Sequence, residues 1–93
     1  MNCSRITYKL HAVDQMFNRD IRQEEVEHVL VEGETIASYP TDKPYPSLLR
    51  LGLIDGRPIH IVVAQDEQGN CYIVTAYEPD LFLWNTDFKT KKK

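Results

Sequence analysis

Arg57-Pro58-Ile59-His60-Ile61-Val62-Val63-Ala64 and, after a polar break, Cys71-Tyr72-Ile73-Val74-Thr75-Ala76-Tyr77 are the two runs that decide the fold of this chain. Both are rich in β-branched and aromatic residues and are bounded by turn formers, which is typical of two neighbouring strands. His60 lies in the middle of the first run. Because a buried strand seldom carries a titratable side chain without a partner, either His60 has such a partner or its face of the sheet is open.

The segment before these runs predicts a hairpin. Asp55-Gly56 is a strong two-residue turn signal, and Ser47–Ile54 precedes it as a strand. If the turn is centred on this pair, Arg50 lies opposite Ile61. Arg50 and His60 would then lie on opposite faces of the sheet, although a one-residue slip or a bulge would reverse this.

Helical periodicity appears upstream. A first helix is predicted from about Lys9 to Asn18, and a second from Gln23 to Gly33 with Arg22 as its N-cap. Glu25 would be the third residue of the second helix, and an apolar pair at 21 and 26 would flank the cap. Strands are also expected at 35–39 and, as an additional strand, at 5–8. The segment 80–84 predicts a helical turn that docks on the sheet.

These elements predict an α+β fold, in which two N-terminal helices pack on a four-stranded or larger antiparallel sheet. We expect a single domain over residues 1–93 with a disordered lysine-rich tail at about 89–93. One sheet face would pack on the helices, and the other would be partly open. The predicted core is Val13, Phe17, Val26, Leu30, Ile61, Val63, Ile73 and Trp84.

Composition excludes several classes of protein. The net charge of −3 argues mildly against nucleic-acid binding, and the apolar stretches are too short to span a membrane. We therefore expect a cytoplasmic protein without a membrane partner. Cys3 and Cys71 lack the spacing of a disulfide framework or a zinc site, so Cys71 is interpreted as a small core residue. Neither a metal nor a cofactor is expected.

Several blocks of the chain match one known family. They are His11-Ala12 with Met16, Arg19 and Ile21; Glu24-Glu25-Val26; Tyr39-Pro40; Asp42 to Ser47; Arg57 to Ala64; and Val74 to Asp80 with Trp84 and Phe88. Over nearly its whole length the chain resembles the bacterial domain-of-unknown-function family numbered 4258, and it resembles the RelE/ParE toxin-like superfamily. Gln15 stands where the family often has a basic residue, and Arg22 where it has a short capping residue.

The resemblance implies a toxin of a type II toxin–antitoxin pair. Such a toxin would act as an mRNA-cleaving endoribonuclease without a metal. Its implied partners are a cognate antitoxin, of the MqsA zinc-finger type, and mRNA or the ribosome. The resemblance implies the fold more firmly than the activity, because related folds support several functions. The alternative is a non-catalytic protein-binding module of the same fold, which the acidic net charge favours.

RNA cleavage needs a base for the 2′-hydroxyl, a cation for the phosphate and an acid for the leaving oxygen. A polar stripe on the first helix begins at His11, and Tyr77 closes the last strand. The candidate catalytic residues are His11, His60 and Tyr77, and the candidate RNA-binding residues are Lys43, Arg50 and Arg57. Each has a structural alternative, such as a histidine that is hydrogen-bonded within the sheet or a tyrosine that packs over its edge. The predicted site lies on the open sheet face near the start of the first helix.

Overall fold

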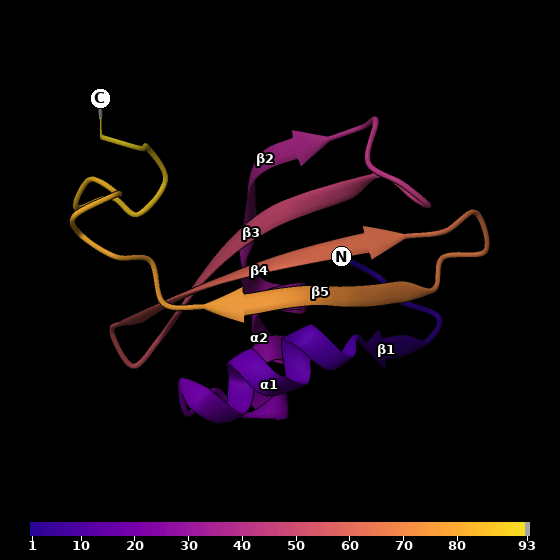
Figure 1. Cartoon of the computed structure of the whole chain (residues 1–93), viewed down its shortest axis with the longest axis horizontal. Coiled ribbons are helices and arrows are strands. Elements are labelled where there is room, and N and C mark those ends of the chain that lie inside the picture. The colour runs from indigo at the N-terminus through magenta and orange to yellow at the C-terminus, as the bar shows by residue number, and fades with distance from the viewer. Residues whose placement is uncertain (93) are drawn as a thin grey trace.

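The computed structural model describes residues 1–92. Two helices and five strands follow one another as β1 (Ile6–Tyr8), α1 (Leu10–Asn18), α2 (Gln23–Glu32), β2 (Glu34–Tyr39), β3 (Ser47–Ile54), β4 (Arg57–Gln65) and β5 (Cys71–Tyr77). Both helices lie against one side of the sheet, with α1 along β5, and the C-terminal residues extend beyond the end of β5 (Figure 1). The predicted α+β arrangement is confirmed. Neither helix within residues 1–92 is long and apolar enough to cross a membrane.

The sheet is mixed, with the strand order β1-β5-β4-β3-β2. Strands β2 to β5 pair antiparallel with their sequence neighbours, as predicted. Strand β1 instead pairs parallel with β5, matching Ile6 with Cys71 and Tyr8 with Ile73. The expectation of a purely antiparallel sheet is therefore corrected. The long connection from β1 to β5, which includes both helices, permits this parallel pairing.

The β3–β4 hairpin has the predicted register. Asp55 and Gly56 have φ angles of 51° and 82°, and a turn with two positive φ angles matches the twist of the flanking strands. Arg50 pairs with Ile61, and Leu51 pairs with His60. Because side chains alternate along a strand, Arg50 faces the helices and His60 faces away from them.

The core lies between the helices and the sheet. Five predicted core residues are fully or almost fully buried, namely Val26, Leu30, Ile61, Val63 and Ile73. Trp84 is also buried, but it covers the opposite sheet face. The prediction for α1 is wrong, because Val13 is 47% exposed and Phe17 is 87% exposed. Ala12 and the partly buried Met16 face the core instead, so α1 presents its other apolar stripe to the sheet.

Helix α2 approaches β3 very closely at Gly52. A Cβ atom at this position would lie 2.6 Å from Cγ2 of Val29, so only glycine fits without movement of the helix. At the other end of α2, the backbone amide of Arg22 donates a hydrogen bond to the Glu25 carboxylate at 2.8 Å, as the predicted cap requires. These contacts fix α2 across the middle of the sheet.

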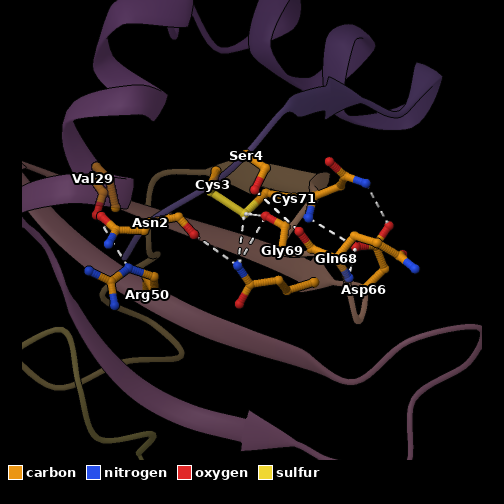
Figure 2. Close-up of a disulfide and its surroundings, with 11 residues drawn as sticks. Asn2, Cys3, Ser4, Val29, Arg50, Asp66, Gln68, Gly69 and Cys71 are labelled. Carbon is orange, nitrogen blue, oxygen red and sulfur yellow. Dashed lines mark hydrogen bonds between the residues drawn. A yellow bond between two sulfur atoms is a disulfide. The ribbon is translucent and has the colours of Figure 1, made fainter.

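Cys3 and Cys71 form a disulfide, which corrects the expectation that the cysteines are not bridged. Figure 2 shows the bond beside the Gly69 turn, with Asn2 and Ser4 close to it. The pairing of β1 with β5 brings the two cysteines together, since their Cα atoms are 5.5 Å apart although 68 positions separate them in the sequence. Cys71 is fully buried, so its predicted place in the core is confirmed.

The C-terminal residues fold back on the sheet. Asp80 to Trp84 form the predicted turn, with the amides of Leu83 and Trp84 donating to the Asp80 carbonyl. In the lysine-rich tail, the Lys89 ammonium contacts the Glu34 carboxylate at 2.8 Å, and the Lys92 amide donates to the Leu83 carbonyl. Lys93, the last residue of the tail for which we predicted disorder, lies outside the described residues.

Candidate functional site

His60 has partners on both ring nitrogens. Its Nε2 lies 2.7 Å from the carbonyl oxygen of Phe88, and its Nδ1 lies 3.2 Å from the Tyr77 hydroxyl. A carbonyl only accepts hydrogen bonds, so Nε2 carries a proton. When the ring is neutral, Nδ1 therefore accepts from the Tyr77 hydroxyl and the imidazole is held in one tautomer. The sequence left two alternatives, a His60 with a hydrogen-bond partner and a His60 on an open sheet face. The structure has the first.

The C-terminal residues cover this pair. The Trp84 ring meets the His60 ring edge to face, with centroids 4.6 Å apart, and His60 is fully buried. Burial lowers the pKa of His60, which the hydrogen bond to the Phe88 carbonyl only partly opposes. Burial likewise raises the pKa of Tyr77. We call His60, Tyr77, Trp84 and Phe88 the histidine cluster.

Arg50 lies under the helices and binds the end of α2. Its guanidinium donates to the carbonyls of Val29 at 3.4 Å and Gly33 at 2.6 Å and to the Thr35 hydroxyl at 2.8 Å. Only 7% of the residue is exposed. A cation at these carbonyls complements the negative end of the helix dipole. The geometry assigns Arg50 a structural contact rather than one with RNA.

Arg57 also makes contacts within the protein. Its guanidinium donates to the carbonyls of Arg19 at 2.7 Å and Asp20 at 2.9 Å, at the turn between the two helices. It also forms an ion pair with Glu78, the residue after β5. Arg57 thus joins three segments that are distant in the sequence, and each of its three guanidinium nitrogens already donates a hydrogen bond.

His11 and Lys43 meet at a groove on the sheet face that points away from the helices. The cross-strand neighbours Ser47, Ala64 and Tyr72 form its floor. The groove has a volume of about 450 Å³ and is lined by Lys9, His11, Asp42, Lys43, Pro44, Tyr45, Ser47, Ala64, Tyr72 and Val74. We call it the tyrosine groove. Within residues 1–92, no hydrogen bond or ion pair holds the side chain of His11 or of Lys43, and both are exposed.

Two aromatic rings and a further cation complete the groove. The rings of Tyr45 and Tyr72 stack with centroids 5.5 Å apart and planes at 18°, and the Lys9 ammonium lies 5.4 Å from the Tyr72 ring centroid. Tyr72 donates its hydroxyl to Asp66 at 3.0 Å, which raises the pKa of the phenol and fixes the ring. Asp42 accepts a hydrogen bond from the Ser47 hydroxyl at the edge of the groove.

The six predicted site residues thus fall into separate groups. His11 and Lys43 share the tyrosine groove, His60 and Tyr77 share the histidine cluster, and the two arginines hold the scaffold. Sequence reasoning missed Lys9, Tyr45 and Tyr72. Alternation along β5 alone would place Tyr72 and Tyr77 on opposite faces. The irregular register opposite Val62 and Val63 brings both tyrosines to the face without helices, because Tyr72 pairs with Ala64 and Tyr77 with His60. A larger hollow of about 580 Å³ beside the end of α2 contains none of the predicted residues.

No group of three or more His, Cys, Asp or Glu side chains within residues 1–92 is arranged to hold a metal ion. The cationic groups of the tyrosine groove suit an anion instead, and its stacked rings suit a flat ligand. An anionic ligand with a flat ring, such as a nucleotide, matches both features.

The sequence profile of the family described as a domain of unknown function (DUF4258) matches residues 8–78. The chain belongs to this family. No curated protein and no solved structure matches it.

Proposed function

We propose that this member of the DUF4258 family is a toxin-like protein of the RelE/ParE superfamily that binds and cleaves single-stranded RNA in the tyrosine groove. The observation that carries the proposal is the convergence of Lys9, His11 and Lys43 on the stacked rings of Tyr45 and Tyr72. Single-stranded RNA is commonly recognised by base stacking on aromatic side chains combined with cations along the backbone. The groove provides both within one hollow.

In this mechanism an unpaired base extends the tyrosine stack, and the ammonium groups of Lys9 and Lys43 contact the phosphates. The exposed imidazole of His11 takes the proton of a ribose 2′-hydroxyl. The resulting oxygen attacks the adjacent phosphorus, and the lysines stabilise the charge that develops on the phosphate oxygens. The leaving 5′-oxygen takes a proton from a water molecule, and the protonated His11 gives its proton to the hydroxide that remains. The RNA is left with a cyclic phosphate end.

Of the residues predicted from the sequence, the proposed site keeps only His11 and Lys43, and it adds Lys9, Tyr45 and Tyr72. Phe88 and Tyr77 already occupy both nitrogens of the His60 imidazole, so it has no free atom for a substrate. The acidic net charge of −3 also makes the affinity for free RNA depend on the few cations of the groove. The ribosome would then help to position mRNA, and a zinc-finger antitoxin of the MqsA type is the proposed partner.

The test is growth arrest and RNA cleavage upon induced expression. Wild type should arrest growth and fragment RNA, and His11→Ala and Lys43→Ala should abolish both at matched protein levels. His28→Ala is the control for His11→Ala, because His28 is also an exposed helical histidine but lies outside the groove. Tyr77→Phe should keep the activity. Loss of activity in Tyr77→Phe with retention in His11→Ala would place the site in the histidine cluster and refute the groove.

A non-catalytic protein-binding module is the second candidate. Three apolar residues on α1 favour it, since Leu10 is 77% exposed, Val13 is 47% exposed and Phe17 is 87% exposed. They lie three and four positions apart and so form one outward stripe, which suits a protein partner. If wild type neither arrests growth nor cleaves RNA, this candidate replaces the first.

A further inference from the structure

The two sulfurs of the disulfide differ in access. Cys71 is fully buried, whereas Cys3 is partly exposed. Cys3 also lines a hollow of about 260 Å³, together with Met1, Ile6, Glu27 and Val31. A small thiol that enters this hollow reaches the Cys3 side of the bond first.

The two sulfurs also differ in their polar surroundings. The Gln65 amide nitrogen lies 3.7 Å from the sulfur of Cys71, and it donates as well to the carbonyls of Asn2 at 2.9 Å and Gly69 at 3.3 Å. Figure 2 shows Asn2 and Gly69 next to the disulfide. The Gln65 amide has two N–H donors, and the two carbonyls accept them at the shorter distances, so its contact with Cys71 is weak. The difference in access therefore makes Cys3 the sulfur that an incoming thiol attacks.

We propose that the Cys3–Cys71 bond is a thiol-exchange site for small thiols, with Cys3 as the residue that becomes modified. The thiolate of the small thiol forms a bond to the Cys3 sulfur while the Cys3–Cys71 bond breaks. The electron pair of that bond moves to the Cys71 sulfur, which takes the proton that the small thiol released. A second molecule of thiol then displaces Cys3 from the mixed disulfide. The small thiol is oxidised to its own disulfide, and both cysteines are reduced.

Exchange at this bond acts on the edge of the sheet. The segment after Cys3 is held on β5 by a short ladder, in which the amides of Ser4, Cys71 and Lys9 donate to the carbonyls of Gly69, Arg5 and Ile73 at 2.9, 2.7 and 3.0 Å. Strand β1 has only three residues. Opening the disulfide removes the covalent end of this ladder, so β1 separates from β5 more readily.

The ladder ends at the tyrosine groove. Lys9 follows β1 and Tyr72 follows Cys71, and both line that groove. Reduction therefore loosens two groove residues together. This consequence for RNA binding rests on the proposed function, whereas the exchange chemistry and the release of β1 do not.

The first experiment treats the oxidised full chain with 2-mercaptoethanol, quenches with an alkylating agent and maps the cysteines by peptide mass spectrometry. Under native conditions the mercaptoethanol adduct should appear on Cys3 and the alkyl group on Cys71. The same reaction in denaturant is the control, and there the adduct should spread over both cysteines. An adduct on Cys71, equal adducts on both in the native chain, or no exchange before unfolding would overturn the proposal.

The second experiment measures hydrogen exchange and thermal unfolding. In the reduced chain the amides of Cys71 and Lys9 should exchange faster, while that of Ile61 in the β3–β4 hairpin keeps its protection. The thermal midpoint should fall by about 10 °C or more, because the bond closes a long loop. The Cys3→Ser variant should have the exchange rates and the thermal midpoint of the reduced chain, and added thiol should not change them. Unchanged exchange at Cys71 and Lys9 would refute the release of β1.

RNA binding is measured on the same oxidised and reduced samples with a short single-stranded RNA. Weaker binding after reduction supports control of the groove by the disulfide, and equal binding in the two states refutes that control. If the oxidised chain binds no RNA, the proposed function of the groove fails. The cysteine mapping and hydrogen exchange still decide the exchange site in that case.

Discussion

The histidine cluster and the tyrosine groove use similar side chains on one face of the sheet, yet they are different environments. His60 is fully buried, with both nitrogens bonded and a tryptophan ring against it, whereas His11 is exposed beside two lysines. Burial makes the first histidine part of the packing. Exposure and nearby positive charge leave the second available to a ligand. The comparison teaches that burial decides whether a polar side chain belongs to the packing or is free to bind a ligand.

The largest expected effect on stability comes from removing the Trp84 side chain, which covers His60. Trp84→Ala should lower the free energy of unfolding by about 3–5 kcal/mol, because Trp84 is buried against His60. Phe82→Ala is the matched control, since Phe82 lies in the same segment but is 89% exposed. Denaturant unfolding of both variants measures the difference. Equal effects of the two substitutions would show that the C-terminal residues do not pack on His60 in solution.

The next prediction compares the contributions of His60 and His11 to the free energy of unfolding. His60→Leu should cost about 1–3 kcal/mol, because it leaves the Tyr77 hydroxyl and the Phe88 carbonyl without their partner. His11→Leu should change the stability by less than about 0.5 kcal/mol, because His11 is exposed. The same unfolding assay compares them. A larger cost for His11→Leu would reverse the distinction.

The pH dependence of stability sharpens the comparison further. Burial lowers the pKa of His60, so the unfolded chain binds a proton at a pH where the folded chain does not. The stabilising effect of a neutral His60 is complete above the unfolded pKa of about 6.5. It is lost as the pH falls toward the folded pKa, with a slope of at most about 1.4 kcal/mol per pH unit. Urea unfolding between pH 8 and pH 5 should show this loss in wild type and in His11→Leu, but a reduced loss in His60→Leu.

The smallest effect concerns α1. Phe17→Ala should change the free energy of unfolding by less than about 0.5 kcal/mol, because Phe17 is 87% exposed. Leu30→Ala is the buried counterpart on α2 and should cost about 2–5 kcal/mol. Thermal unfolding of the two variants distinguishes them. A cost of several kcal/mol for Phe17→Ala would show that the apolar stripe of α1 is covered in solution.

Local sequence signals predicted much of the fold. Asp55-Gly56 determined the hairpin register, because a two-residue turn with positive φ angles leaves one pairing for the strands that follow. The start of α2 was predicted from Arg22 and Glu25 for a similar reason, since a helix cap involves neighbouring residues only. In each case the deciding contacts lie within a few positions of one another.

Features that depend on distant residues could not be predicted. Helix α1 carries one apolar stripe through Leu10, Val13 and Phe17 and another through Ala12 and Met16, and periodicity alone does not say which one faces the sheet. The disulfide follows from the parallel pairing of β1, which no local pattern indicates.

The candidate site was only partly predictable for the same reason. The sequence indicated His11 and Lys43, but the cover over His60 comes from a segment without periodicity. The contribution of Tyr72 depends on which sheet face the groove occupies, and that is decided by the position of the helices.

The parallel strand β1 has a consequence for the order in which the protein assembles during its synthesis. The β3–β4 hairpin can close as soon as its own residues emerge, since its strands are joined by two residues. Strand β1 is made first but must wait for Cys71, Tyr72 and Ile73 before it has a partner. At ordinary translation rates this delay is on the order of several seconds. The hairpin is complete once Gln65 has emerged, shortly before Cys71 to Ile73, so the first strand of the sheet to be synthesised is among the last to join it.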